Sequence, residues 1–201
     1  MDKQKKEELL KQIRDEVLNL KSSPLYSYRV ANNYYPVIGQ GNHDAKIMFI
    51  GEAPGRNEAE SGIPFCGAAG KILDELLASI GLPRSEVYIT NILKDRPPEN
   101  RDPLPEEIKV YAPFLDRQIE IIQPQVIVTL GRFSTAYILE KFGLKNEIKP
   151  ISQIKGKVFS ANPLLGHAVK IIPLYHPAVA VYNNNVKEEL KKDFQVIKQF
   201  L

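Results

Sequence analysis

The sequence predicts an α/β protein in which a parallel sheet is covered by helices on both faces. Four short apolar runs are separated by helical patterns, over residues 46–50, 87–90, 126–130 and 169–172. Such runs are typical of strands buried on both faces, and strands that alternate with helices predict parallel pairing. In a sheet of this kind the ligand crevice lies beyond the carboxyl ends of the strands. We therefore look for a site in the segments that begin at Gly51, Asn91, Gly131 and Tyr175.

Five helices are expected around these strands. The first is amphipathic, because leucine, isoleucine and valine recur at helical spacing among charged residues over residues 4–20. The others are predicted over residues 72–80, from residue 105 onward, 133–142 and 186–201. Proline and two acids favour a helix start at Pro105, and Pro113 is expected to kink or interrupt that helix. The stretch 21–44 is interpreted as irregular structure.

Length and composition fit one globular domain that spans residues 1–201. The net charge is +3, from 27 Lys and Arg against 24 Asp and Glu, which permits nucleic-acid binding without arguing for it. Cys66 is the single cysteine, which excludes an internal disulfide and an all-cysteine metal site. No apolar run approaches the roughly 18 residues of a membrane span. We expect a cytoplasmic monomer with no membrane partner.

Two glycines and a proline directly follow the first predicted strand, in Gly51-Glu-Ala-Pro-Gly55. Glycine lets backbone N–H groups approach a ligand closely, and Glu52 and Glu58 add carboxylates near the crevice. The alternative interpretation is a tight turn with solvated acids. Dinucleotide and P-loop sites are not indicated, because neither G-x-G-x-x-G nor G-K-[ST] occurs here.

An aromatic residue, Phe65, lies between Pro64 and a glycine-rich helix start. It is either a core side chain, the commoner fate, or a platform on which a flat base stacks, an interaction worth roughly 1–3 kcal/mol per base. The sequence leaves both interpretations open.

The loop after the second predicted strand begins at Asn91 and contains Lys94, Arg96 and Arg101. Clustered cations at the mouth of a crevice favour contact with phosphates. The Asn91 amide offers the paired donor and acceptor that a pyrimidine edge needs. A lone asparagine is, however, more often a satisfied turn residue.

A histidine, His176, ends the fourth predicted strand and precedes Pro177. In this place an imidazole can stabilise negative charge that develops on a leaving group. No second His or Cys at ligand spacing supports a metal role.

The chain resembles the uracil-DNA glycosylase superfamily, and family 4 most closely, in five motifs: Gly51-Glu-Ala-Pro-Gly55, Pro64-Phe-Cys-Gly67, Ile89-Thr-Asn91, Lys94-x-Arg-Pro-Pro-x-Asn100 and His176-Pro177. The likeness covers essentially the whole chain. It implies a three-layer α/β/α sandwich with a central four-stranded parallel sheet. It also implies hydrolysis of the N-glycosidic bond of deoxyuridine, flipped out of DNA, as the first step of base excision repair.

The resemblance also implies roles for individual residues. Phe65 would stack on the uracil, Asn91 would read its edge, and His176 would hydrogen-bond a carbonyl of the leaving base. Glu52 would position water and stabilise the sugar cation. The remaining catalytic and substrate-binding positions that match the family are Glu58, Asn100, Gly51 and Ala53. The candidates for contact with DNA are Lys94, Arg96, Arg101 and, as a wedge, Val179 or Val181.

One family feature is missing. Family 4 enzymes resemble one another in four cysteines that bind a [4Fe–4S] cluster, and by motif register these positions hold Leu20, Ser23, Asp95 and Tyr111. None of them supplies a thiolate, so we expect no cluster and no other metal or cofactor. We expect side chains to fill the space, with Tyr111 within it and Asp95 paired with a nearby Arg or Lys.

Two alternatives to an active uracil-removing enzyme stay open. One is a DNA-binding homologue without catalysis, although a pure binder would not need Glu52, Asn91 and His176 together. The other is a glycosylase that also removes deaminated bases such as hypoxanthine or xanthine. Covalent trapping of the product, as in a related branch, is not expected because residues 94–101 contain no histidine. The sequence does not specify a replication-clamp partner.

Overall fold

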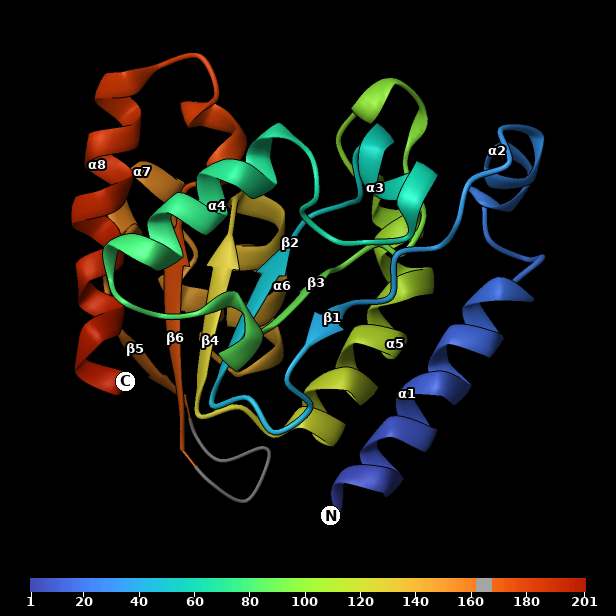
Figure 1. Ribbon diagram of the computed structural model, residues 1–201, viewed down its shortest axis with the longest axis horizontal. Helices are drawn as coiled ribbons and strands as arrows, with labels where there is room; N and C mark the ends of the chain where they lie inside the picture. Colours follow the sequence, from blue (N-terminus) through green and yellow to red (C-terminus); the bar gives the residue numbers. More distant parts are fainter. Residues whose placement is uncertain (162–167) are drawn as a thin grey trace.

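Strands from across the chain form one sheet in the computed structural model, which describes residues 1–161 and 168–201 (Figure 1). The described strands are β1 (Gln40–Gly41), β2 (Ile47–Gly51), β3 (Tyr88–Asn91), β4 (Val126–Leu130), β5 (Phe159–Ala161) and β6 (Val169–Leu174). Their order in the sheet is β1-β3-β2-β4-β6-β5. The four inner strands are parallel and correspond to the four predicted ones. The edge strands β1 and β5 pair antiparallel and are too short to leave a pattern in the sequence.

Helices connect these strands. The α-helices are α1 (Lys3–Leu18), α2 (Tyr26–Ala31), α3 (Arg56–Ser61), α4 (Ala68–Ser79), α5 (Pro105–Ile122), α6 (Arg132–Lys141), α7 (Ile151–Ile154) and α8 (Asn184–Phe194). Short 3-10 helices are η1 (Arg84–Glu86), η2 (Pro98–Asn100), η3 (Lys145–Glu147), η4 (Pro177–Ala180) and η5 (Gln195–Phe200). No helix among the described residues combines the length and apolar character needed to cross a bilayer.

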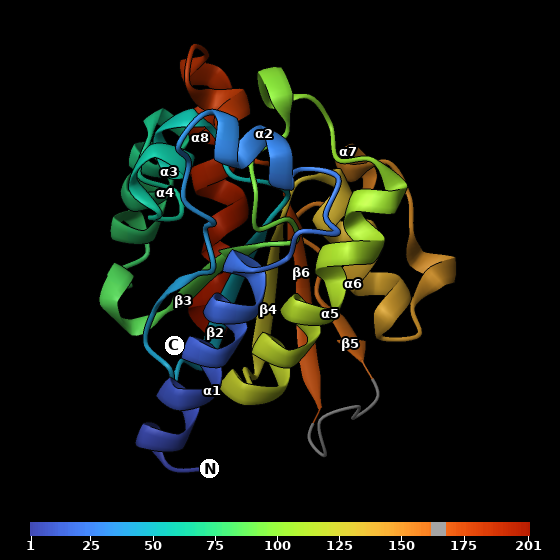
Figure 2. The same ribbon diagram turned by 90° about the vertical axis from the view of Figure 1, so that its right-hand side faces the viewer.

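The sheet has a hydrophobic layer on each face, because successive side chains of a strand point to opposite sides. In β2, Met48 and Ile50 belong to the cluster formed with α1, α5 and α6. Their neighbours Ile47 and Phe49 belong to the cluster formed with α4 and α8. Figure 2 shows α4 and α8 on one side of the strands and α5 and α6 on the other. The predicted three-layer α/β/α sandwich is confirmed.

Two details of the prediction are wrong. Helix α5 continues through Pro113, because its buried face, which includes Tyr111, Leu115 and Ile119, packs into the core and tertiary packing outweighs local propensity. The stretch 21–44 is not wholly irregular, since it contains α2 and β1.

Candidate functional site

A pocket of about 420 Å³ lies beyond the carboxyl ends of β2, β3 and β6, within the usual volume range of ligand sites. Eight residues predicted for the site line it: Glu52, Ala53, Glu58, Phe65, Asn91, Asn100, Arg101 and His176. The structure therefore brings together side chains that are up to 124 residues apart in the chain (Glu52 to His176, 176 − 52). Parallel pairing of the strands produces this convergence, because it places their carboxyl ends at one edge.

The Asn91 side chain is buried at the floor of this pocket. It is 1% exposed, and its Oδ1 has no hydrogen-bond partner among the residues that the structure describes. Gly51 is paired with Asn91 across β2 and β3. A Cβ on Gly51 would lie 2.7 Å from Phe65 Cζ and closer still to Asn91 Oδ1. Glycine is thus required at position 51 to leave room for both side chains.

The loop before α4 fixes the ring of Phe65. Phe65 has a left-handed backbone with φ 50°, a conformation uncommon outside glycine. Glu58 supports the turn, because its Oε1 accepts hydrogen bonds from the N–H groups of Cys66 (3.0 Å) and Gly67 (2.8 Å). A Cβ at Gly70 would collide with the Phe65 carbonyl. The ring is 5% exposed and belongs to the core, so it is both a core side chain and a wall of the pocket.

His176 is held in one tautomer. Its Nδ1 accepts a hydrogen bond from the Ala178 N–H at 3.2 Å, which leaves the proton of the neutral ring on Nε2. Burial lowers the pKa of His176 to about 4, and the Glu58 carboxylate opposes this only weakly. The imidazole is therefore uncharged at neutral pH and offers one N–H donor.

The Glu52 carboxylate lies between the pocket and the start of α6. Its Oε1 accepts the Phe133 N–H at 2.9 Å, an interaction favoured at a helix N-terminus. Gly131 has φ 104°, and a Cβ there would collide with the Glu52 carboxylate. Burial raises the pKa of Glu52, although the Phe133 N–H and the charge of Arg132 oppose the shift.

Lys94 does not face solvent. Its side chain is 0% exposed, and Nζ donates to Gln118 Oε1 (2.6 Å), the Asn91 carbonyl (2.7 Å) and Thr90 Oγ1 (2.8 Å). Burial lowers its pKa well below the usual value. The expected phosphate contact is wrong for Lys94, because a cluster of cations in sequence does not reveal which of them points inward.

Arg96 is also turned into the protein. It is 8% exposed, and its guanidinium donates to Asn100 Oδ1 at 2.8 Å and to the hydroxyls of Tyr34 (2.9 Å) and Tyr28 (3.3 Å). We therefore correct its role from a phosphate ligand to a support for Asn100, which lines the pocket.

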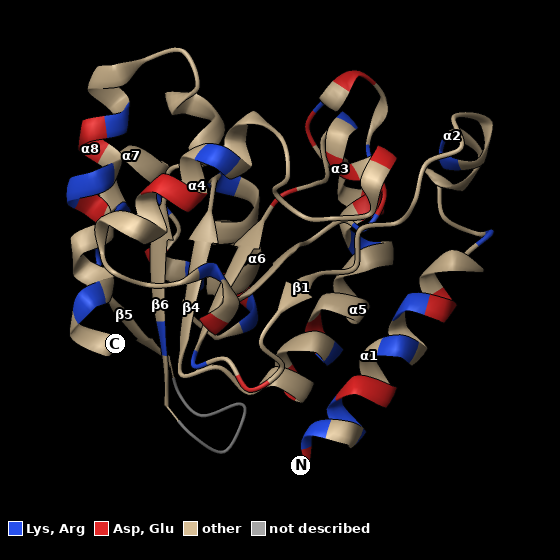
Figure 3. Cartoon of the chain, in the orientation of Figure 1, with Lys and Arg blue, Asp and Glu red and all other residues tan. Residues whose placement is uncertain are grey.

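The remaining candidates for contact with DNA are accessible. Arg101 lines the pocket and pairs with Glu107. Val179 is 48% exposed and is the neighbour of Ala178, which lines the pocket. Figure 3 shows basic and acidic residues intermixed along α1 and α8, in keeping with the small net charge. Pro97, Asp102 and Pro103 also line the pocket, and no role was predicted for them, because prolines and a loop carboxylate carry no signal of which way they face.

Comparison with known proteins decides the family. A model of the uracil DNA glycosylase superfamily matches residues 38–198. The chain belongs to the uracil DNA glycosylase superfamily. This confirms the predicted family and the enzyme class, that of a DNA glycosylase.

Several members of the uracil DNA glycosylase superfamily are similar over most of the chain. The Type-4 uracil-DNA glycosylase of Archaeoglobus fulgidus is 48% identical, over 94% of this chain and 92% of the relative. The corresponding protein of Saccharolobus solfataricus is 46% identical, over 94% of this chain and 85% of the relative. The Type-4 uracil-DNA glycosylase of Thermotoga maritima is 37% identical, over 98% of this chain and 96% of the relative.

Three of the four positions where the resemblance to family 4 places cluster ligands hold a polar network, and the fourth is the apolar Leu20. The Tyr111 hydroxyl lies 2.6 Å from Ser23 Oγ and 2.6 Å from Asp95 Oδ2, and Asp95 faces Arg29 at 3.4 Å. Burial raises the pKa of Asp95, opposed by the Tyr111 hydroxyl and Arg29. The single cysteine, Cys66, is exposed. These donors do not fit a [4Fe–4S] cluster, which needs thiolates, and the expected places of Tyr111 and Asp95 are confirmed.

Proposed function

We propose that this chain is a uracil-DNA glycosylase that flips deoxyuridine out of DNA and hydrolyses its N-glycosidic bond. The observation that carries the proposal is the buried Asn91 amide, whose Oδ1 lacks a partner in the described part of the chain and lies in a pocket that Phe65 and His176 also line. An unpaired buried acceptor is unfavourable, so its presence at the floor of a pocket indicates a ligand that donates a hydrogen bond. The names of the relatives given above support uracil in DNA as that ligand.

Recognition follows from the donors and acceptors of the base. Uracil donates from N3–H and accepts at O4, which matches the Oδ1 and Nδ2 of Asn91. Cytosine has an acceptor at N3 and a donor at N4, so the same amide in the same orientation opposes it at both positions. Phe65 supplies the apolar face for stacking. A base reaches this pocket only after it leaves the stack, at a cost of a few kcal/mol.

The neutral imidazole assists departure of the base. As the bond between C1′ and N1 breaks, negative charge develops on the uracil, and His176 Nε2–H donates to the O2 carbonyl. Glu52, in its deprotonated form, stabilises the positive charge on the sugar and orients the water that adds to C1′. The water proton passes to the carboxylate, the departing uracil anion takes up a proton from solvent at N1, and Glu52 returns its proton to solvent, so that one water is consumed. The products are free uracil and an abasic site.

We further propose that the enzyme works without a [4Fe–4S] cluster, since none of the residues at the ligand positions has a thiolate and three of them are hydrogen-bonded to one another. Iron analysis of protein purified without oxygen tests this. We expect far less than one iron per chain and no broad visible absorption, whereas four irons per chain would refute it.

Release of free uracil from oligonucleotides with U·G, U·A or single-stranded uracil tests the main proposal. Matched T·G and C·G duplexes serve as controls, and a panel with hypoxanthine and xanthine tests a broader range. We expect release from uracil substrates and none from thymine or cytosine. Binding to all of these DNAs without release of any base would support a non-catalytic homologue instead.

A further inference from the structure

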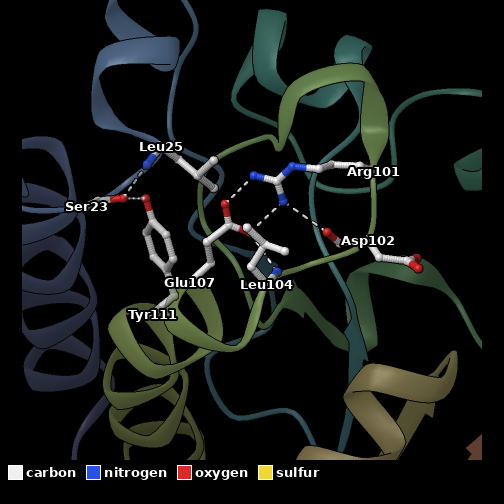
Figure 4. Close-up of polar contacts among 7 residues, drawn as sticks. All are labelled: Ser23, Leu25, Arg101, Asp102, Leu104, Glu107 and Tyr111. Atoms are coloured by element: carbon white, nitrogen blue, oxygen red, sulfur yellow. Dashed lines mark hydrogen bonds and ion pairs between the residues drawn. The ribbon is translucent and has the colours of Figure 1, made fainter.

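One face of α5 carries two buried polar side chains that the proposed reaction does not use. Glu107 and Tyr111 are one helical turn apart, and both are 0% exposed. In Figure 4, Glu107 points toward Arg101 and Tyr111 points toward Ser23. Their contacts fall at the two ends of the segment 95–104. The part of the pocket wall that lies between those ends consists of Pro97, Asn100, Arg101, Asp102 and Pro103.

Glu107 holds the second end of this segment. Its two carboxylate oxygens accept hydrogen bonds from Arg101 Nη2 (2.6 Å) and Nη1 (2.9 Å), a paired geometry. Oε2 also accepts the Leu104 N–H at 2.8 Å. Burial favours a raised pKa for Glu107, but the bonds from Arg101 and Leu104 outweigh it, and the pKa lies below its usual value. The carboxylate is therefore charged while it holds Arg101 against the pocket.

Tyr111 holds the first end. Its hydroxyl donates to Asp95 Oδ2 at 2.6 Å and, because it has only one proton, accepts from the Ser23 hydroxyl. Ser23 Oγ in turn accepts the Leu25 N–H at 3.1 Å. The phenol therefore ties the segment that leads into α2 to the loop that follows β3.

Asp95 is held from a second side by Arg29. Arg29 Nε lies 3.4 Å from Asp95 Oδ2, and Arg29 Nη2 donates to the Leu18 carbonyl at 2.8 Å. Both side chains of this pair are nearly inaccessible, at 5% and 1%. The first end of the loop is thus hydrogen-bonded to α5 and ion-paired with α2, and Arg29 of α2 is in turn hydrogen-bonded to the last residue of α1.

The loop between the two ends has an unfavourable backbone. Glu99 and Asn100 both have φ 53°, a left-handed conformation that non-glycine residues keep only where their surroundings impose it. Asn100 is further held by Arg96, the neighbour of Asp95. If either end of the loop were released, the backbone at Glu99 and Asn100 would be free to relax, and the pocket would lose one wall.

We propose that Glu107 and Tyr111 are positioning residues that hold the Asp95–Leu104 loop in the shape the uracil pocket needs. Ser23, Asp95 and Tyr111 stand at three of the four positions where the resemblance places cluster ligands. The polar network thus joins, through side chains alone, the segments that a cluster would join. The proposal rests on the proposed function, because it assigns the loop to that pocket.

Tyr111→Phe is the central variant, since it removes the hydroxyl and keeps the ring. Tyr137→Phe is a matched control. Its hydroxyl also donates to an α5 carboxylate, Asp116, at 2.7 Å, and neither residue lines the pocket. The measurements are amide hydrogen exchange over residues 96–104, the single-turnover rate of uracil release and the dissociation constant for DNA.

We expect Tyr111→Phe to speed exchange in the loop and to slow single-turnover release, each by about tenfold, the factor expected for one lost hydrogen bond. The dissociation constant should change less than about threefold, because the DNA contacts outside the loop are intact. Tyr137→Phe should leave exchange in the loop and the release rate within about twofold of the parent. Equal effects of the two variants on the loop and on release would overturn the proposal.

Glu107→Gln and Glu107→Ala provide a second test if Tyr111→Phe folds poorly. Gln keeps an acceptor for Arg101, so Glu107→Gln should slow uracil release less than Glu107→Ala. Equal losses of rate would count against positioning by Glu107.

The proposed function and the positioning role of Glu107 and Tyr111 fail in different ways. A parent protein that releases no uracil contradicts the proposed function, while hydrogen exchange in the loop still tests whether Glu107 and Tyr111 hold it. If the parent is active but the loop exchanges at the same rate in the parent and in every variant, only the positioning role of Glu107 and Tyr111 is contradicted.

Discussion

The imidazole of His176 stacks on the ring of Phe65, with centroids 5.5 Å apart and planes 25° from parallel. A base inserted between two rings needs twice a carbon contact distance, roughly 7 Å. Uracil therefore cannot enter between these side chains as they stand, and we expect it to contact Phe65 beside the imidazole. The Phe65 ring contributes to the burial of the imidazole, and burial disfavours the charged form.

This stack predicts the titration of His176. With a pKa near 4, the ring should stay neutral from about pH 5 upward, so the release rate should show no step near the usual histidine pKa of about 6.5. The unfolded chain takes up this proton at about pH 6.5 and the folded one only near 4. Stability should therefore fall as the pH is lowered through that window.

An NMR titration of ring protons measures this pKa, and His176→Gln assigns the signal among the three histidines. Phe65→Ala should raise the pKa toward 6.5 because it admits water. A His176 that titrates near 6.5 in the parent would disprove the lowered pKa.

Asn91→Asp should slow uracil release by at least about 100-fold, because it replaces the Nδ2 donor with a second acceptor in a site built for pairing. Single-turnover kinetics on a U·G duplex measure the effect. Asn146→Asp, at an exposed position in η3, is the control and should leave the rate unchanged. Unaltered turnover in Asn91→Asp would remove Asn91 from the recognition of the base.

Gly51→Ala should abolish most activity and also lower the free energy of unfolding by about 1–3 kcal/mol, because it overpacks a buried strand. The new Cβ would press on Asn91 and Phe65, and we expect a fall in release of roughly 100-fold. Gly81→Ala should lower stability without lowering activity. Gly81 has φ 72° with open space around it, so the change should cost about 1 kcal/mol of stability and leave release intact. Thermal denaturation and release assays on both variants separate the two effects.

Lys94→Met should lower the stability of the fold without changing the electrostatic contribution to DNA binding. Its amino group is buried among four uncharged acceptors, and we expect the free energy of unfolding to drop by about 3 kcal/mol because these acceptors lose their donor. The salt dependence of DNA affinity should keep its slope, because a lost phosphate contact would lower the slope by about 1. Urea denaturation and salt titrations test this, with the exposed Lys192→Met as control. A lower slope in Lys94→Met would restore Lys94 as a phosphate ligand.

The order of strands and helices was determined by the sequence. Continuous apolar runs predicted the four inner strands, because both faces of these strands are buried. Glu52, Asn91 and His176 stood out as polar residues that end or follow those runs. Parallel pairing then brings strand ends together whatever their separation in the chain. For this reason the pocket was predictable from local patterns.

The direction of side chains in loops was decided only by the tertiary structure. Lys94, Arg96 and Arg101 look alike in sequence, yet Lys94 is buried under Asn91, Arg96 supports Asn100, and Arg101 pairs with Glu107. A cation in a loop turns inward wherever the fold supplies acceptors to replace water. Those acceptors come from β3, α2 and α5, which only the folded chain brings to the same place.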